Sequence, residues 1–317
     1  MILKISVIIT VYNKAQFLPG VIKSLINQTI APQMEFIFVD DASTDNSIEI
    51  IKQNTSKIQN IQIIKSEQNL GPSIRLNQGA KKASGEYLLL MDGDDVLFNN
   101  AAEIMLNLIE NKRADFIYGK RKKLETTQNI SIVEKIEFVL SNEPLYYILT
   151  NKNLVNMSSL VRYDLFKKAE GCDERIFIQD ESLPLRLALN AKRFIDLKNA
   201  VIGIMPEGNK HSYKRLSKNL SQQFHDRFLA YYNFINDNYD KIDRYQNLLF
   251  NRCVSTMWKH AQEQQAFPYL SKYFWYYILS KIYPRLQNKE TIEKINHEFS
   301  KVANIRRMKE SGAGCRI

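Results

Sequence analysis

One stretch near residue 90 constrains the fold of this chain most, because an apolar run ends there in a cluster of carboxylates. Leu88 to Met91 are apolar, and Asp92, Asp94 and Asp95 follow them. An apolar run that stops at polar residues predicts a buried strand whose C-terminal end opens into a crevice. Acidic groups this close repel one another unless a cation lies among them, and their oxygens favour Mg²⁺ or Mn²⁺. A lone Asp-x-Asp is also common in solvated acidic turns, so the neighbouring sequence decides.

Strands and helices alternate before this stretch. The apolar pattern predicts strands at 5–11, 35–39, 61–65 and 87–91, and helices at 15–27, 46–51 and 73–83. This alternation predicts an α/β fold with a mainly parallel, doubly wound sheet, in which ligands bind beyond the carboxyl ends of the strands. Three strand ends would therefore meet in one crevice: Thr10 to Asn13, Asp40-Asp41 and Asp92 to Asp95.

The strand ends indicate a site for a nucleoside diphosphate. The sequence has neither a Gly-x-Gly-x-x-Gly turn nor a Walker A loop, so a metal at the aspartates would have to hold the phosphates. An Asp at the end of the second strand can accept hydrogen bonds from a base or a ribose. Asp40 and Asp45 have a second interpretation, because either can cap the helix that follows.

Several motifs in this order resemble family 2 of the glycosyltransferases. The motifs are Val7 to Asn13, Val39 to Asp45, Asn77-Gln78-Gly79, Ala83 to Tyr87 and Met91 to Asp95. The resemblance extends over about residues 4 to 203 and implies the GT-A fold, with inverting transfer of a sugar from a nucleotide donor. It implies that Thr10, Tyr12, Asp41 and Asp92 bind the nucleotide. It also implies that Asp92 and Asp94, with the adjoining Asp95, hold Mg²⁺ or Mn²⁺.

The resemblance also assigns a catalytic base. Relatives open a helix with an acidic pair and end it with Leu-Arg-Leu, and the second acid removes the proton from the acceptor. That acid aligns with Asp180, while Gln179 replaces the first acid. Glu181 is the base if the alignment is wrong by one residue, and Asp180 could instead cap the helix.

Two basic residues allow two interpretations each, and one basic run allows a single expectation. Arg75 stands one residue before the position where many relatives have Arg, so it is either a diphosphate ligand or a surface helix residue. His211 matches a region where some relatives have a metal-binding His, and a polar loop residue is the alternative. The run Lys120 to Lys123 is expected to form a solvated hairpin or loop.

The C-terminal third differs in charge from the rest. Residues 1–203 contain 25 basic and 24 acidic residues, and residues 204–317 contain 19 and 10, which together give the net charge of +10. Helical periodicity appears at 216–238, 245–264 and 291–307. The aromatic segment Pro268 to Pro284 predicts either a helix in a membrane interface or a helix packed on its neighbours. The tail after Arg306 gives no structural signal.

The whole sequence predicts an α/β GT-A domain at 1–212, with a nucleotide-sugar half to about residue 100, and a helical appendage at 213–317. Three distant cysteines and the lack of an apolar span of membrane length favour a cytoplasmic protein, peripheral at the membrane's inner face if the acceptor is lipid-linked. The expected activity is metal-dependent sugar transfer from a UDP-sugar to a cell-envelope glycan or a lipid-linked acceptor. A nucleotidyltransferase and a non-catalytic glycan-binding protein are the alternatives, and no nucleic acid partner is expected.

Overall fold

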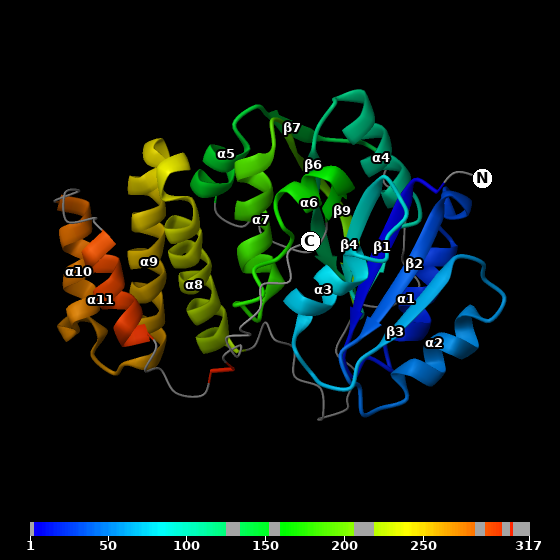
Figure 1. Cartoon of the computed structure of the whole chain (residues 1–317), viewed down its shortest axis with the longest axis horizontal. Helices are drawn as coiled ribbons and strands as arrows, with labels where there is room; N and C mark the ends of the chain where they lie inside the picture. Colours follow the sequence, from blue (N-terminus) through cyan, green and yellow to red (C-terminus); the bar gives the residue numbers. More distant parts are fainter. Residues whose placement is uncertain are drawn as a thin grey trace.

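The computed structural model describes residues 3–124, 134–151, 159–205, 219–282, 289–299 and 305–306. A twisted sheet lies between two layers of helices, and the last four helices stack at one end (Figure 1). The strands are β1 (Ile5–Val11), β2 (Met34–Asp40), β3 (Ile61–Lys65), β4 (Tyr87–Asp92), β5 (Asp95–Leu97), β6 (Phe116–Lys123), β7 (Phe138–Ser141), β8 (Ser159–Arg162) and β9 (Phe194–Ile204). The helices of the sheet domain are α1 (Leu18–Ile26), α2 (Ser47–Thr55), α3 (Pro72–Ala80), α4 (Ala101–Asn111), α5 (Pro144–Thr150), α6 (Tyr163–Lys168) and α7 (Gln179–Asn190). The C-terminal helices are α8 (Leu220–Asn238), α9 (Gln246–Gln264), α10 (Lys272–Ile282) and α11 (Lys289–Phe299).

The predicted α/β architecture is confirmed. The described strands lie in the order β3-β2-β1-β4-β8-β6-β9-β5, and β7 pairs with β9. The first four are parallel to one another, whereas β8 runs antiparallel to β4. The register places Thr10 beside both Val39 and Asp92. Because parallel strands end at one edge of the sheet, the polar residues that follow β1, β2 and β4 are neighbours.

The sheet has a hydrophobic core on each face. Ile5, Val7 and Ile9 of β1 belong to one core, and Ile8 belongs to the other. This alternation is the result of the two-residue period of a strand, which points successive side chains to opposite faces. Strands that are apolar at every position are therefore buried on both sides, as an α/β sandwich requires.

The structure differs from the expectation for the basic run and shows how the aromatic segment folds. The run at 120–123 belongs to β6, which pairs with β9, so the solvated loop predicted there is wrong. The aromatic segment divides into a short helix, η5 (Pro268–Leu270), and α10. In the part of the chain that the structure describes, no helix is both long enough and apolar enough to cross a bilayer.

The C-terminal helices share a core with the sheet domain. Phe228 of α8 and Leu249 of α9 lie in the same apolar cluster as Leu183 and Leu187 of α7. The domain division after residue 212 remains a prediction, because residues 206–218 lie outside the described ranges. The shared core nevertheless couples α8 to α7, the helix that carries the predicted base.

Candidate functional site

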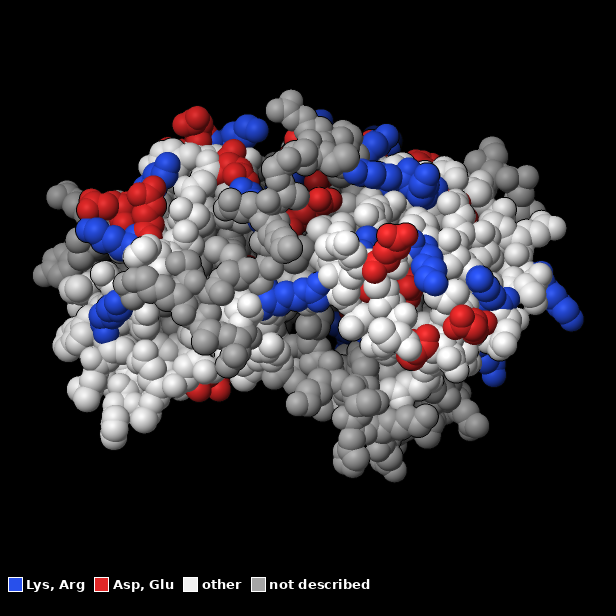
Figure 2. All heavy atoms as spheres, turned by 60° about the horizontal axis from the view of Figure 1, so that its bottom comes forward, with Lys and Arg blue, Asp and Glu red and all other residues white. Residues whose placement is uncertain are grey.

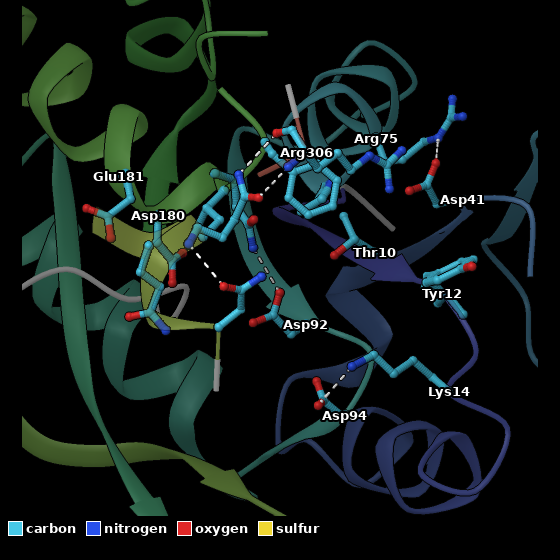
Figure 3. Close-up of a pocket in the computed structure, with 18 of the residues that line it drawn as sticks. Thr10, Tyr12, Lys14, Asp41, Arg75, Asp92, Asp94, Asp180, Glu181 and Arg306 are labelled. Atoms are coloured by element: carbon cyan, nitrogen blue, oxygen red, sulfur yellow. Dashed lines mark hydrogen bonds and ion pairs between the residues drawn. The ribbon is translucent and has the colours of Figure 1, made fainter. Parts of the chain in front are cut away.

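A cavity of about 810 Å³ opens beyond the carboxyl ends of β1 and β4. Its size suits a nucleotide-sized ligand, and α7 and α8 form the wall opposite the strand ends (Figure 3). The predicted site residues that line it are Thr10, Tyr12, Asp41, Asp92, Asp94, Asp180 and Glu181. The structure thus brings together residues that are up to 171 positions apart, from Thr10 to Glu181. Asp95 is not among the lining residues, and His211 lies outside the described part of the chain.

The loops after β1 and β2 are joined at the edge of the cavity. The backbone N–H of Asn13 donates to Ser43 Oγ at 3.0 Å, and Asn13 Oδ1 accepts the N–H of Thr44 at 2.8 Å. Ala42 has a φ of +62°, a conformation that is strained for a residue with a side chain and that persists only where its surroundings fix it. Asp45 is not the N-cap of α2, which is Asn46, but its carboxylate accepts the backbone N–H of Ser47 at 3.0 Å and of Ala15 at 3.0 Å. It therefore ties the start of α2 to the loop after β1.

The carboxylate of Asp41 fixes the start of α3. It accepts the backbone N–H groups of Leu70 at 2.7 Å and Gly71 at 2.8 Å, and it also accepts Arg75 Nε at 2.7 Å. Gly71 has a φ of +95°, and a Cβ there would lie 2.5 Å from the Phe177 ring. Only glycine fits this turn. Arg75 is buried beside the cavity, so its interpretation as a surface helix residue is wrong.

Asp92 faces the helix that carries the predicted base. Gln179 Nε2 donates to Asp92 Oδ1 at 3.1 Å, and Arg121 Nη2 lies 4.0 Å from Asp92 Oδ2. This hydrogen bond explains why position 179 holds a glutamine and not an acid. A carboxylate in its place would repel Asp92, whereas the amide donates a hydrogen bond.

The other two carboxylates of the cluster have separate cationic partners. Lys14 Nζ lies 2.9 Å from Asp94, as Figure 3 shows, and both side chains line the cavity. Asp95 is buried beneath the lining, where Arg121 Nη2 lies 2.5 Å from its carboxylate. Arg121 comes from the basic run of β6, and its inward orientation compensates two of the three aspartates.

The described residues contain no group of three or more His, Cys, Asp or Glu side chains arranged to hold a metal ion. Asp92 and Asp94 nevertheless suit Mg²⁺ or Mn²⁺, because these ions need only one or two protein carboxylates when phosphate oxygens complete the shell. Both residues line the cavity, so their oxygens are reachable by a ligand. The chemistry of this donor pair therefore fits the predicted cofactor.

Asp180 has the environment of a proton acceptor. It lies in the first turn of α7, whose N-cap is Ile178, so the interpretation as a helix cap is wrong. Its Oδ1 is buried and has no hydrogen-bond partner among the described residues. Burial raises the pKa of Asp180 well above its ordinary value, and the negative charge of Asp92 raises it further, while Arg121 lowers it. A carboxylate with a raised pKa and a spare lone pair is suited to remove a proton from a hydroxyl.

Glu181, the alternative base, is already paired. Arg227 of α8 donates to both of its oxygens, at 2.9 and 2.8 Å. Burial raises the pKa of Glu181, and the hydrogen bonds from Arg227 lower it. Asp226, the residue before Arg227 on α8, accepts the backbone N–H of Ile178 at 2.9 Å. Helix α8 thus fixes the start of α7 through two contacts and leaves Asp180 facing the cavity.

Sequence comparison places this cavity in a known family. Residues 6–156 match the family model described as glycosyl transferase family 2. The chain carries a glycosyltransferase domain of family 2. The matched range includes the strand ends with Asp41, Asp92 and Asp94, and it ends before α7.

Named relatives of the glycosyltransferase domain include two bacterial enzymes. Poly(ribitol-phosphate) beta-glucosyltransferase of Bacillus spizizenii is 34% identical over 158 residues, which are 45% of this chain and 25% of the relative. Cholesterol galactosyltransferase of Borreliella burgdorferi is 29% identical over 210 residues, which are 62% of this chain and 58% of the relative. The chain thus spans between a quarter and three fifths of the length of these two relatives.

Solved structures confirm the GT-A fold. Staphylococcus aureus TarS 1–349 in complex with UDP-GlcNAc aligns with a TM-score of 0.59 and 17% identity over 94% of this chain and 92% of that chain. Mannosyltransferase PcManGT of Pyrobaculum calidifontis, in complex with GDP-Man and Mn²⁺, aligns with a TM-score of 0.60 and 12% identity over 95% and 85% of the two chains. At these identities, the likeness concerns the fold alone.

Most of the cations of the site were not predicted from the sequence. Lys14 follows the first predicted strand end directly and could have been found there, and Arg121 was hidden in a basic run. Arg227 and Arg306 come from the C-terminal third, and both line the cavity. No local pattern predicts these two, because their contacts join segments that are far apart in the sequence.

Arg227→Met should destabilise the protein, because it leaves Glu181 buried without its counter-charge. The change raises the folded-state pKa of Glu181 further above its raised wild-type value. The loss of stability relative to wild type is therefore small below the wild-type folded-state pKa and grows as pH rises past it. Because Arg227 is partly exposed, we expect a loss of only about 1–3 kcal/mol near neutral pH and a smaller loss near about pH 4. Denaturant unfolding at both pH values measures it.

The matched control for that experiment is the double variant Arg227→Met/Glu181→Gln, which removes the buried charge as well as its partner. It should recover part of the lost stability at neutral pH. A loss that is equal at both pH values, or no recovery in the double variant, would contradict the ion-pair explanation.

Proposed function

We propose that this chain transfers a sugar, with inversion, from a UDP-sugar to a hydroxyl of a cell-envelope glycan or a lipid-linked oligosaccharide. The observation that carries the proposal is Asp180, a carboxylate whose buried Oδ1 has no partner among the described residues and whose side chain faces the cavity across from Asp92. The family match and the GT-A fold support sugar transfer. The relative that acts on poly(ribitol-phosphate) supports an envelope acceptor.

The donor nucleotide would lie at the ends of β1 and β2. The ring of Tyr12 is 43% exposed, so it is available for contact with a base. Asp41 has about four lone-pair positions and accepts three hydrogen bonds within the protein, which leaves room for one from the base or ribose. Thr10 adds a hydroxyl on the same side of the cavity, and Asp92 stands where the ribose and the diphosphate would meet.

Asp92 and Asp94 would hold Mg²⁺ or Mn²⁺, with Asp95 behind them and His211 as a further predicted ligand outside the described residues. The bound cation would neutralise charge on the leaving diphosphate. Without it, Lys14 compensates Asp94 at 2.9 Å. The pairing of these carboxylates with Lys14 and Arg121 explains how the protein tolerates three acids at one strand end.

The transfer step assigns one task to Asp180. Its carboxylate accepts the proton of the acceptor hydroxyl while the hydroxyl oxygen forms a bond to the anomeric carbon. The bond from that carbon to the diphosphate oxygen breaks at the same time, and the nucleoside diphosphate leaves from the opposite face. The raised pKa makes Asp180 a stronger base than an ordinary aspartate.

We also propose that the far end of the helical region meets an anionic membrane that holds the acceptor, so that the protein works at the inner face of the cell membrane. Trp275, Leu279 and Ile282 are exposed at i, i+4 and i+7 along α10 and form one apolar stripe. Lys272 and Lys281 of the same helix supply positive charge. Figure 2 shows a broad uncharged area low on the side that holds these helices, with basic side chains at its edge.

Asp180→Asn should retain donor binding and lose turnover by about 10²-fold or more, because the amide keeps the shape but cannot accept the proton. Hydrolysis of a panel of nucleotide sugars, with and without Mn²⁺, identifies the donor first. The released product separates the two enzyme classes, because a glycosyltransferase releases nucleoside diphosphate and a nucleotidyltransferase releases pyrophosphate. Near wild-type turnover in Asp180→Asn would show that Asp180 is not the base.

Asp94→Ala should abolish the gain in UDP affinity that Mn²⁺ brings, since one of its two cavity carboxylates is lost. Calorimetric titration with UDP, with and without Mn²⁺, measures the gain. Asp45→Ala is the control, because it removes a nearby carboxylate that binds the backbone N–H of Ser47 and does not line the cavity. An unchanged Mn²⁺ effect in Asp94→Ala would overturn the metal assignment.

The double variant Trp275→Ser/Ile282→Ser should lose binding to anionic vesicles that the wild-type chain binds at low salt. The exposed apolar side chains and the basic residues both attract the protein to the vesicle, and each nearby basic residue contributes roughly 1 kcal/mol. Salt screens only this electrostatic contribution. Co-sedimentation at low and high salt measures binding, and Tyr146→Ser changes an exposed aromatic residue on α5 as the control. Wild-type protein that ignores anionic vesicles even at low salt would refute this placement.

A further inference from the structure

One cation of the cavity that the sugar-transfer chemistry leaves unused is Arg306. It belongs to a short described segment, residues 305–306, that lies beside α8 and the start of α3, far along the sequence from the other lining residues. In Figure 3, its side chain lies between the Asp41 side of the cavity and the Asp180 side. A residue from the end of the chain thus completes the wall of a cavity built mainly by the first two thirds.

The backbone of Arg306 is held by one buried glutamine. Its N–H donates to Gln222 Oε1 at 2.8 Å, and its carbonyl accepts Gln222 Nε2 at 3.2 Å. Gln222 is only 2% exposed, and its Nε2 also donates to Asp226 Oδ1 at 2.8 Å. The amide therefore pairs with both backbone groups of Arg306, as a neighbouring strand would, and anchors the residue to the helix that positions α7.

The guanidinium of Arg306 is positioned by neutral groups. It donates to the carbonyl and the side-chain oxygen of Asn69, and its central carbon lies 4.5 Å from the centre of the Phe177 ring. Two of its five N–H donors face Asn69, so donors remain for a ligand. Stacking on an aromatic ring fixes the plane of the guanidinium without neutralising its charge.

The surroundings of Arg306 differ from those of four other cations that line the cavity. Lys14, Arg75, Arg121 and Arg227 each form an ion pair with a carboxylate. In the described ranges, Arg306 contacts no carboxylate. A positioned cation with uncompensated charge at the wall of a cavity is suited to an anionic ligand, and a guanidinium fork matches phosphate oxygens.

We infer that Arg306 binds the phosphates of the donor nucleotide, so that the C-terminal segment supplies part of the donor site. This inference rests on the proposed function, because it takes the cavity ligand to be a nucleotide sugar. It assigns to the C-terminal third a binding role besides the support of α7. It also accounts for a charged side chain that is fixed in place without an acidic partner among the residues that the structure describes.

The test compares ligands that differ only in phosphate. Calorimetry of the full chain with UDP, UMP and uridine should show that Arg306→Gln lowers UDP affinity by about tenfold to a hundredfold, the usual effect of one charge-assisted hydrogen bond. Uridine affinity should not change. The UDP affinity of Arg306→Lys should lie between those of the wild type and Arg306→Gln, because lysine keeps the charge but lacks the planar guanidinium fork. Arg244→Gln is the matched control, since Arg244 pairs with Glu143 on the surface away from the cavity.

The outcomes separate the inference from the function on which it rests. An equal loss for UDP and uridine would show that Arg306 only holds the segment in place, and an unchanged UDP affinity would overturn the inference outright. The same loss of UDP affinity in Arg244→Gln would show that the effect comes from the overall positive charge of the protein and not from the position of Arg306. If the wild-type chain binds neither UDP nor GDP and hydrolyses no nucleotide sugar, the proposed function fails, and the inference fails with it.

Discussion

Compensation of buried negative charge is the constraint on which the rest of the site depends. Removing a carboxylate from water is costly unless a cation or several hydrogen bonds accompany it. Asp41, Asp94, Asp95 and Glu181 each have a cationic partner, and each partner comes from a different segment of the chain. The acids therefore join loops, strands and helices from distant parts of the sequence. The exception among the acids that line the cavity is Asp180, the proposed base.

That exception is Asp180, whose isolation depends on its neighbours. Arg227 pairs with Glu181, and Oδ1 of the preceding carboxylate, Asp180, has no hydrogen-bond partner among the described residues. Gln179 donates to Asp92, which keeps a negative charge opposite Asp180 without adding another at position 179. Burial is the main reason why the pKa of Asp180 is raised, and the negative charge of Asp92, which Gln179 holds in place, raises it further. Its cost to stability is borne by the apolar core that α7 shares with α8 and α9.

The helical region has a part in the site that its sequence does not reveal. Helix α8 holds the first turn of α7 through Asp226 and Arg227, and Gln222 of the same helix holds the backbone of Arg306. The contact between α8 and α7 is buried, so the C-terminal helices are part of the support of the cavity. Removing them would expose the apolar side of α7 along with the carboxylates that they compensate.

Local sequence determined the sheet and the place of the site. The apolar runs at 5–11 and 87–91 give strands within one residue of the observed bounds, because burial on both faces leaves a continuous apolar signal. Asp41 and Asp92 follow from the rule that parallel strands end at one edge. Only the tertiary structure decided that Arg75 is buried and that Arg121 points inward, since an ion pair depends on a partner that lies tens of residues away. Sequence thus determines which acids reach the crevice, and folding determines which cations meet them.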